Sequence, residues 1–396
     1  MNLPQLSAVE AAIERLSAKL QTVECQPCAI AEAAGRIVAE DVLADRDSPP
    51  LDVSAMDGYA FRLDDWDGGM LPVQATAAAG RAPLQLLPGT AIRIFTGAAI
   101  PAGADCVIRR EDTQEFGEQV RLTVARMELQ SGQNIRRRGE NSLQGVCVLA
   151  AGQRIDAASI AALATFGGQR LTVRRKVRVA VLNTGDELVE PGAAVEDWQI
   201  RDSNGPTLHT WLTSLPWVEV VARQRVQDTL DGVRQALQTQ LANCDAILLT
   251  GGVSMGDTDF VPAAIELLGG EIVFHRLPIR PGKPVLGAVL NGKLLLGLPG
   301  NPVSVAVTSR VFGEPLLRRL AGCSSRSWQP LVELSEVDDK RLDLTWYRLV
   351  HIADDGQVHL VTSQGSGDVV SLSRSSGFVE VTPGARGDGP VRLSLW

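Results

Sequence analysis

Residues 248–261, LLTGGVSMGDTDFV, join a buried apolar run to an apolar-periodic run. The residues before the glycines are typical of a buried strand, and 260–268 are typical of a helix. Gly251, Gly252 and Gly256 let the backbone adopt positive φ, so that several N–H groups can converge on one oxyanion at the start of that helix. The stretch therefore predicts an α/β fold with an anion site where the strand ends.

Two carboxylates, Asp257 and Asp259, lie in the same stretch. Mg²⁺ is usually held by one or two carboxylates together with substrate phosphates, so this pair indicates a divalent cation between protein and phosphate oxygens. The same residues also suit the capping of the following helix. The stretch alone leaves both interpretations open.

The whole chain is acidic and has 396 residues, a length that favours roughly two to four domains. The formal net charge of −8 argues against a nucleic-acid or membrane-surface binder, which needs an excess of basic residues. No apolar run approaches the roughly 20 residues of a membrane span and no signal pattern opens the chain, so we expect a cytoplasmic protein. The only C-x-x-C, Cys25 and Cys28, has no second pair at metal spacing, which argues against structural zinc.

The first part of the chain reads as a helical segment followed by a small β domain. Ser7 and Glu10 fit a capping box at the start of an amphipathic helix, and a second short helix is predicted over 30–38. Predicted strands lie at 84–87, 91–95, 106–109 and 120–124. Two loops, 54–60 and 96–97, hold more polar residues than a turn needs, and a small-residue helix is predicted over 155–166.

The β domain closes with an arginine-rich loop, NIRRRGEN, at residues 134–141. Three successive arginines are ordinarily a solvated charge run. Guanidinium groups also match phosphate oxygens, so phosphate binding is the sharper alternative.

From residue 177 onward, strand and helix patterns alternate, which predicts a doubly wound α/β domain. Strands are expected at 177–182, 218–221, 246–249, 271–275 and 284–289, and helices at 207–214, 229–241, 260–268 and 303–320. Polar loops at 183–187, 202–205, 248–261 and 298–302 follow strands, where ligands gather in such sheets. Lys283, one of only five lysines, lies between two prolines on the loop 279–284.

The α/β segment contains neither of two common nucleotide-binding motifs. Residues 287–294 have P-loop spacing, but Leu294 replaces the required Ser or Thr, and Asn291-Gly292 predicts a hairpin turn. No G-x-G-x-x-G follows the first strand, which excludes the Rossmann fingerprint. After residue 320, strand patterns at 331–334, 346–351, 357–361, 377–381 and 391–395 predict a C-terminal β domain, and its polar turn 365–368 is a weaker ligand candidate.

The polar loops, taken in order, resemble one family. SAMDGYA, Thr96-Gly97, NIRRRGE, TGDEL, DSNG, GGVSMGDTD, PGKP and LPGNPVS resemble the molybdopterin molybdenumtransferases, the insertases that include the gephyrin E domain. The resemblance implies an elongated homodimer of four-domain subunits. It implies Mg²⁺-dependent insertion of molybdate into adenylylated molybdopterin with release of AMP, and molybdopterin adenylyltransferase as the upstream partner.

The resemblance also implies four domains and their site residues. They are a helical linker domain (1–47 and 139–175), a β domain (48–138), an α/β molybdopterin-binding domain (176–326) and a C-terminal β-barrel-like domain (327–396). Catalytic roles are expected for Asp57, Thr96, Glu187, Asp228 and Asp259, and metal binding for Asp257 and Asp259. Substrate binding is expected for Arg136, Arg137, Asp202, Ser203, Gly251, Gly252, Ser254, Arg276, Arg280, Lys283, Pro299, Asn301 and Pro302. The β domain of one subunit is expected to meet the α/β domain of the other.

Several features leave alternatives open. Asn141 stands where the family commonly has Asp, Arg276 and Arg280 stand where it has lysines, and the turn after Gly365 lacks a His. Asp228 also suits a helix cap before Thr229. A tungsten-inserting paralogue, or a scaffold that retains the pterin pocket, are the alternative functions.

Overall fold

The structure is a computed structural model that describes residues 7–167, 170–254, 256, 259–325 and 328–396. The chain divides into two compact units. Unit 1 comprises Met1–Glu40, Ala150–Ile160 and Arg170–Trp396, and unit 2 comprises Asp41–Leu149 and Ala161–Gln169. Each unit is described by itself.

A six-stranded sheet forms the centre of unit 1, with the order β16-β13-β17-β21-β20-β18. The strands are β13 (Val177–Thr184), β16 (Val218–Val226), β17 (Ala246–Thr250), β18 (Glu271–His275), β20 (Leu286–Leu290) and β21 (Lys293–Leu298). The strands β16, β13, β17 and β21 pair in parallel, whereas β20 is antiparallel to both its neighbours. The β20-β21 turn has φ of 52° at Asn291 and 75° at Gly292, which confirms the predicted hairpin.

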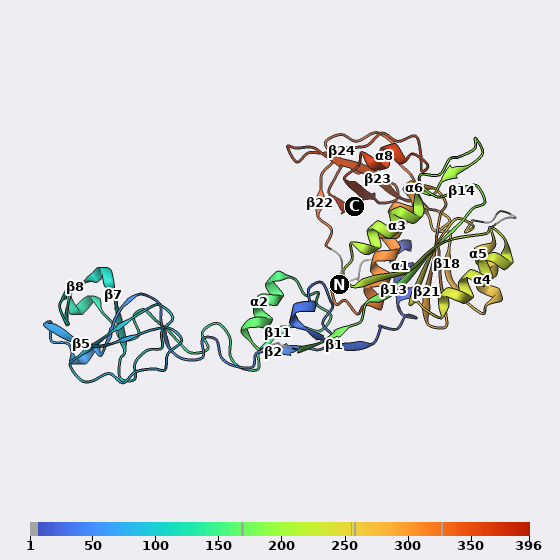
Figure 1. Cartoon of the computed structure of the whole chain (residues 1–396). Helices are drawn as coiled ribbons and strands as arrows, with labels where there is room; N and C mark the ends of the chain where they lie inside the picture. Colours follow the sequence, from blue (N-terminus) through green and yellow to red (C-terminus); the bar gives the residue numbers. More distant parts are fainter. Residues whose placement is uncertain (1–6, 168–169, 255, 257–258, 326–327) are drawn as a thin grey trace, which may run out of the picture. The chain divides into compact units, whose positions relative to one another are not determined.

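Helices cover both faces of this sheet, because its buried strands alternate their side chains between two cores (Figure 1). Val179 and Val181 of β13 face one core, and Ala180 and Leu182 face the other. The first core is completed by α1 (Ala8–Ser17), α3 (Asn204–Thr213) and the helical run of α6 (Pro302–Thr308), a π-turn (Ser309–Gly313) and α7 (Glu314–Leu320). The second is completed by α4 (Leu230–Leu241) and α5 (Phe260–Leu267). This is the layered α/β arrangement that the sequence predicts.

The N-terminal segment confirms one predicted helix and corrects another. Ser7 caps α1 through the predicted capping box with Glu10. The helix expected over 30–38 is wrong, because only a 3₁₀ turn, Ile30–Glu32, forms there. The preceding β1 (Cys25–Ala29) instead pairs with β12 (Arg170–Arg174), and Val38 bridges to Val173. Long-range pairing with a strand far along the chain overrides the local helical pattern.

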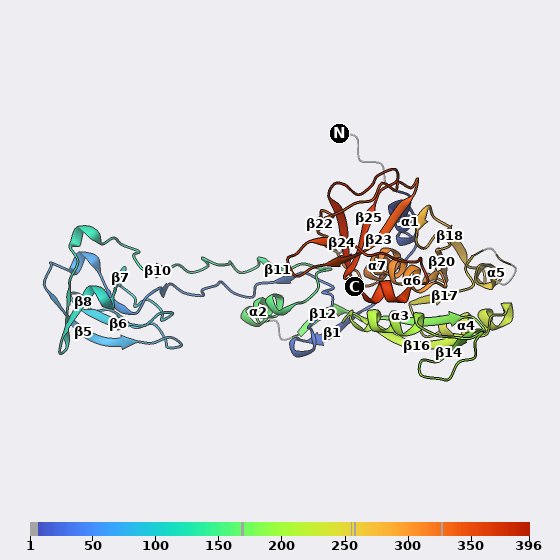
Figure 2. The ribbon, with the colours of Figure 1, turned by 90° about the horizontal axis from the view of Figure 1, so that it is seen from above.

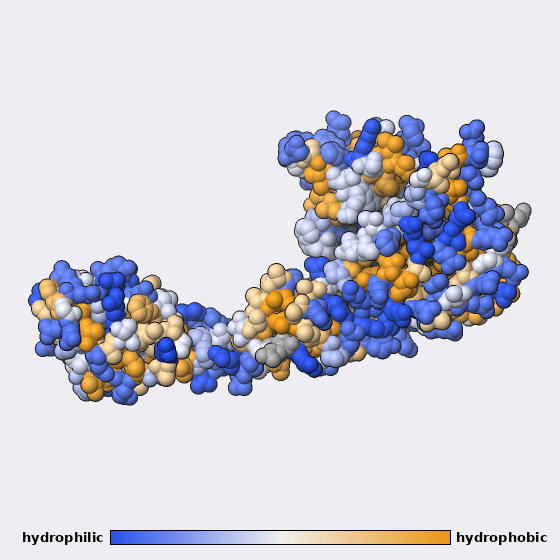
Figure 3. Space-filling model, viewed as in Figure 1, coloured by the Kyte–Doolittle hydropathy of each residue, from blue (hydrophilic) through white to orange (hydrophobic). Residues whose placement is uncertain are grey.

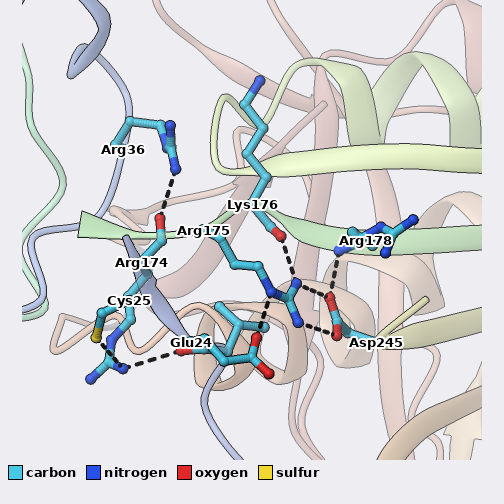
Figure 4. Close-up of polar contacts among 9 residues, drawn as sticks. Glu24, Cys25, Arg36, Arg174, Arg175, Lys176, Arg178 and Asp245 are labelled. Atoms are coloured by element: carbon cyan, nitrogen blue, oxygen red, sulfur yellow. Dashed lines mark hydrogen bonds and ion pairs between the residues drawn. The ribbon is translucent and has the colours of Figure 1, made fainter. Parts of the chain in front are cut away.

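An ion-pair cluster joins the β1–β12 ribbon to the central sheet (Figure 4). The Arg175 guanidinium donates two hydrogen bonds to the Asp245 carboxylate, at 2.6 and 2.8 Å, and one to Glu24 at 2.5 Å. The amide of Arg178 donates a further bond of 2.8 Å to Asp245. Arg175, two residues before β13, and Asp245, directly before β17, thus join the amino ends of these two strands.

The C-terminal strands form a second sheet in unit 1, with the order β19-β23-β25-β26-β22 and with β24 beside β23 (Figure 2). The strands are β22 (Leu331–Val332), β23 (Thr345–Ile352), β24 (Val358–Leu360), β25 (Gly377–Val381) and β26 (Val391–Leu395). Its edge strand β19 (Ile279–Arg280) comes from the α/β segment and pairs in parallel with β23. A short helix α8 (Val369–Ser373), capped by Asp368, was not expected from the strand patterns.

Unit 2 is built on a six-stranded sheet of order β7-β4-β6-β5-β9-β8. The strands are β4 (Gly58–Phe61), β5 (Met70–Ala77), β6 (Ala91–Ile94), β7 (Cys106–Arg109), β8 (Thr113–Phe116) and β9 (Gln119–Leu122). Two short ribbons accompany it: β2 (Val42–Leu43) with β11 (Cys147–Leu149), and β3 (Val53–Ser54) with β10 (Ile135–Arg136). The strand expected over 84–87 is wrong, since only an isolated bridge from Gln85 to Ala102 forms.

The predicted small-residue helix is α2 (Ala157–Thr165), and Figure 3 shows hydrophobic residues gathered over it. Its exposed positions are mostly alanines, which explains a hydrophobic helix surface without large side chains. Among the residues that the structure describes, no helix is long and apolar enough to cross a membrane.

Candidate active site

The glycine turn after β17 is the centre of the site in unit 1. Gly251 and Gly252 have φ of 82° and 62°, as predicted. A Cβ at Gly251 would lie 2.6 Å from the Thr184 carbonyl oxygen, so the loops after β13 and β17 approach too closely for a side chain. The amide of Gly251 donates to the carbonyl of Leu298 at the end of β21. The turn therefore joins the carboxyl ends of three parallel strands, whereas the φ expected for Gly256 depends on residue 255, which lies outside the described residues.

Asp259 occupies the cap position of α5, but its side chain makes no capping hydrogen bond. Its Oδ2 instead accepts from the amide of Gly256 at 2.6 Å. The carboxylate is thus directed to the loop before the helix, and the simple capping interpretation is wrong. Asp257, the other expected metal ligand, lies outside the described residues.

Asp228 is the centre of an acidic cluster at the carboxyl ends of the strands. Burial raises the pKa of its carboxyl, and the nearby charges of Asp186, Glu187 and Asp259 raise it further. Its Oδ1 is buried and has no hydrogen-bond partner among the described residues. Thr229, not Asp228, caps α4, through a bond from the Gly232 amide. The capping interpretation of Asp228 is therefore wrong too.

This cluster suits a cation. An unpaired, buried carboxylate oxygen surrounded by other carboxylates is costly without positive charge nearby. Within the described part of the chain, no group of three histidine, cysteine or carboxylate side chains forms a metal site by itself. Mg²⁺ needs only one or two protein carboxylates when substrate phosphates supply the other ligands. The residues present therefore fit Mg²⁺ held jointly with a phosphate.

A buried polar network lies under the site. The Asn183 amide donates to the Thr250 hydroxyl at 2.7 Å, and the Asp202 carboxylate accepts from the Gly205 amide at 2.9 Å. Asn204 donates to the Gly300 carbonyl at 2.7 Å, which joins α3 to the loop after β21. Asp202 was an expected binding residue, whereas Asn183, Thr250 and Asn204 lie in the predicted polar loops without an assigned role. The available signal was a polar residue at the end of each otherwise apolar strand.

The loop after β21 carries three expected binding residues, of which Pro299 is buried and Pro302 begins α6. The Asn301 amide donates to the Ser366 hydroxyl at 3.0 Å, and the Ser366 carbonyl accepts from Val303 at 2.9 Å. The polar turn of the C-terminal sheet therefore lies against this loop. The polar turn 365–368, the weaker ligand candidate of the sequence, therefore lies next to the loop after β21.

The expected cationic residues Arg276, Arg280 and Lys283 are all exposed. Arg276 has φ of 60°, and the Arg280 guanidinium lies 5.7 Å from the centre of the Trp346 ring. The preceding His275 is hydrogen-bonded through Nε2 to the Val253 carbonyl at 2.7 Å, which links β18 to the glycine loop. Ser203 precedes α3 without a capping bond, and Ser254 is exposed beside the glycine turn.

Unit 2 holds a second group of expected site residues. The Asp57 carboxylate accepts from both the amide and the hydroxyl of Thr96, each at 2.7 Å. These bonds hold the pKa of Asp57 below its ordinary value. Ser54 joins the two loops, because its carbonyl accepts from the Gly97 amide while β3 pairs with β10. Asp57 and Thr96 thus form an exposed pair in which a neutral threonine donates to an ionised carboxylate.

The arginine loop pairs mainly with carboxylates of its own unit. Arg137 donates to Asp52 at 2.7 Å, and Arg138 donates to Asp47 at 2.5 Å. Arg136 donates to the Asn141 side chain at 2.5 Å, the position where the family commonly has Asp. The triplet therefore braces the segments that flank the sheet of unit 2. Any phosphate bound by Arg136 and Arg137 competes with these partners.

Comparison with known proteins agrees with this geometry. Residues 7–167 match the MoeA N-terminal region (domains I and II), and residues 180–319 match a probable molybdopterin-binding domain. A molybdopterin molybdenumtransferase of Synechococcus elongatus is 35% identical over 95% of this chain and 94% of its own length. That of Haemophilus influenzae is 35% identical over 88% of this chain and 87% of its own.

The fold has solved relatives as well. A molybdopterin biosynthesis MoeA protein from Pyrococcus horikoshii superimposes with a TM-score of 0.83 at 26% identity, covering 99% of this chain and 100% of that one. The resemblance seen in the sequence is thereby confirmed. The chain belongs to the molybdopterin molybdenumtransferase family, whose members are transferases.

Proposed function

We propose that this protein inserts molybdate into adenylylated molybdopterin. In the balanced reaction, molybdate and the adenylylated dithiolene give molybdenum-loaded molybdopterin, AMP and water, with uptake of one proton. The acidic cluster around Asp228, beside the glycine turn, is the single observation that carries this proposal. It supports a site that binds an anionic substrate and a cation together.

The two kinds of group in the site have different tasks. The Gly251-Gly252 turn offers backbone N–H groups to a phosphate at the edge of the sheet. Asp228 and Asp259, with Glu187 nearby, would hold Mg²⁺, which would supply positive charge to the phosphoanhydride when bound. Lys283, Arg276 and Arg280 add cationic charge for molybdate and the pterin phosphate. Asn204 joins α3 to the loop after β21, and Asp202 accepts from the Gly205 amide at the start of α3.

Asp57 and Thr96 belong to the same reaction in this proposal, but to the site of a second copy of the chain. Asp57 is ionised and held by Thr96, so it can orient a proton-bearing group or a cation without reorganising. We propose a homodimer in which unit 2 of each copy completes the site on unit 1 of the other. The upstream adenylyltransferase supplies the substrate in this scheme.

The direct test combines purified protein, adenylylated molybdopterin, molybdate and Mg²⁺. We expect AMP release together with transfer of molybdenum to the pterin, and loss of both on chelation of Mg²⁺. Release of no AMP, or AMP without molybdenum transfer, contradicts the proposed reaction. Tungstate in place of molybdate measures which oxyanion the site prefers.

The shared site has its own test. Asp57→Ala and Asp259→Ala proteins should each be inactive, whereas co-expressed mixed dimers should recover part of the activity, because one of their two sites is intact. Asp231→Ala, which removes an exposed carboxylate of α4, is the matched control and should retain full activity. Confirmed mixed dimers without recovery contradict a site shared between subunits.

A further inference from the structure

A ribbon of unit 1 begins and ends at expected site residues. The strands β14 (Leu188–Val189) and β15 (Ile200–Arg201) pair in parallel, and residues 190–199 form the loop between them (Figure 1). The Ile200 amide donates to the Glu187 carbonyl at 2.9 Å, and the Asp202 amide donates to the Val189 carbonyl at 2.8 Å. The ribbon is therefore attached directly to the loops that carry Glu187 and Asp202.

Internal hydrogen bonds brace the loop of this ribbon. The Arg201 guanidinium donates twice to the Ala193 carbonyl, at 3.0 and 2.8 Å. The turn is closed by a bond from the Gln199 amide to the Glu196 carbonyl, and the Gln199 side chain accepts from the Glu196 amide. Arg223 of β16 donates to Glu190, the first residue of the loop, at 3.1 Å. The structure thus gives the loop a defined conformation.

The loop and the start of β15 present apolar side chains to solvent. Trp198 is 75% exposed, Ile200 56% and Val195 38%. Trp198 is two residues from Ile200, so its backbone lies within about 7 Å of the residue that is bonded to Glu187. An exposed aromatic ring on a braced loop, which joins the strands next to Glu187 and Asp202, is a surface that a planar ligand can cover, because an indole has only two side-chain torsions to fix on contact.

We propose that Trp198 is the stacking platform for the adenine of the adenylylated substrate. This inference rests on the proposed function, in which adenine is the neutral planar group at the end of the substrate opposite the pterin. The loop also carries Glu190, Glu196 and Asp197, whose charges disfavour a phosphate beside the ring but not a neutral base. Stacking on an indole face tolerates a base without requiring hydrogen bonds to its edges.

The test uses AMP as the probe, with the full-length protein and isothermal calorimetry. Trp198→Ala should weaken AMP binding roughly 5- to 150-fold, the loss usual for a stacked base, and Trp198→Phe should restore most of it. Ribose 5-phosphate, which lacks the base, should bind equally to both variants and to the unaltered protein. Trp328→Ala removes another exposed tryptophan, 83% accessible, and should change none of these values.

Turnover gives a second reading. With adenylylated molybdopterin, Trp198→Ala should raise KM by a similar factor and leave kcat nearly unchanged, since a stacked base is bound alike in ground and transition states. Unaltered protein that does not bind AMP, equal AMP affinity in Trp198→Ala, or an equal loss for ribose 5-phosphate would overturn the inference. A lower oligomer mass of Trp198→Ala than of the unaltered protein by light scattering would also overturn it, because the ring would then contact another copy. Unaltered protein that binds AMP through Trp198 but inserts no molybdate would refute the proposed function alone.

Discussion

Replacing Asp245 by Asn should destabilise unit 1 by about 3 kcal/mol, the lower end of the loss on breaking a buried ion pair. The Asp245 side chain is only 16% exposed and that of Arg175 26% exposed, so solvent screens their attraction little. Asn keeps the size and one acceptor oxygen, but it removes the charge that faces two guanidinium N–H groups and the Arg178 amide. Arg175 retains Glu24, which limits the loss.

Urea unfolding followed by circular dichroism measures this effect. Asp231→Asn is the matched control, because its pair with Arg234 lies at 3.0 Å but is largely exposed, and exposed pairs contribute about 0–1 kcal/mol. The denaturation midpoint should fall clearly for Asp245→Asn and barely for Asp231→Asn, with little change in the slope. Equal midpoints for the two variants would refute the reasoning that burial gives the Arg175–Asp245 pair its weight.

The same pair predicts a pH dependence. Burial by itself raises the pKa of Asp245, but the hydrogen bonds from Arg175 and the Arg178 amide outweigh it and hold the pKa below its ordinary value. A depressed carboxyl pKa stabilises the fold fully above the unfolded value of about 3.9, and this stabilisation is lost as the pH falls through the folded value. The stability difference between the native protein and Asp245→Asn should therefore shrink below about pH 4. A constant difference down to pH 2 contradicts this assignment.

Three further results are expected. Asp228→Asn should leave the unfolding midpoint unchanged or raised, since it relieves buried like-charge repulsion. Mg²⁺-dependent AMP release should fall at least about 100-fold. Retained turnover would contradict the role of Asp228 in holding Mg²⁺. Gly251→Ala should cost about 1–3 kcal/mol in urea unfolding, because φ is 82° and the Cβ meets the Thr184 carbonyl, whereas Gly89→Ala, at φ 71° in open space, should cost less. Asp57→Asn should lower turnover with little change in the unfolding midpoint, because the Asp57 side chain is exposed and Asn keeps one acceptor for Thr96. A large fall in the midpoint would indicate a structural role.

The sequence predicted most of the α/β layers because strands such as β13 are apolar on both faces and their helices repeat with a clear period. The failures at 30–38 and 84–87 have one cause. In both places the chain is held by distant partners, Val173 in the first and Ala102 in the second, which no local pattern contains.

Side-chain direction set the limit of the site prediction. Asp259 and Asp228 both stand where the sequence suggests a helix cap. The Asp259 carboxylate instead accepts from the Gly256 amide, and Thr229 rather than Asp228 caps α4. Asn183 lies in the predicted polar loop 183–187, but the sequence assigned it no role of its own. Its bond to Thr250 depends on β13 and β17 being neighbours, which only the folded sheet establishes.

The packing of α1 has a consequence for the order in which the chain is made. This helix leaves the ribosome well before β18 and α7, which it contacts and which are synthesised more than 200 residues later. At usual elongation rates of about 5–20 residues per second, its apolar face waits on the order of ten to fifty seconds for a partner. Unit 2, whose main sheet lies wholly within that interval, can fold in the meantime. During synthesis the apolar face of α1 therefore stays exposed until β18 and α7 have been made.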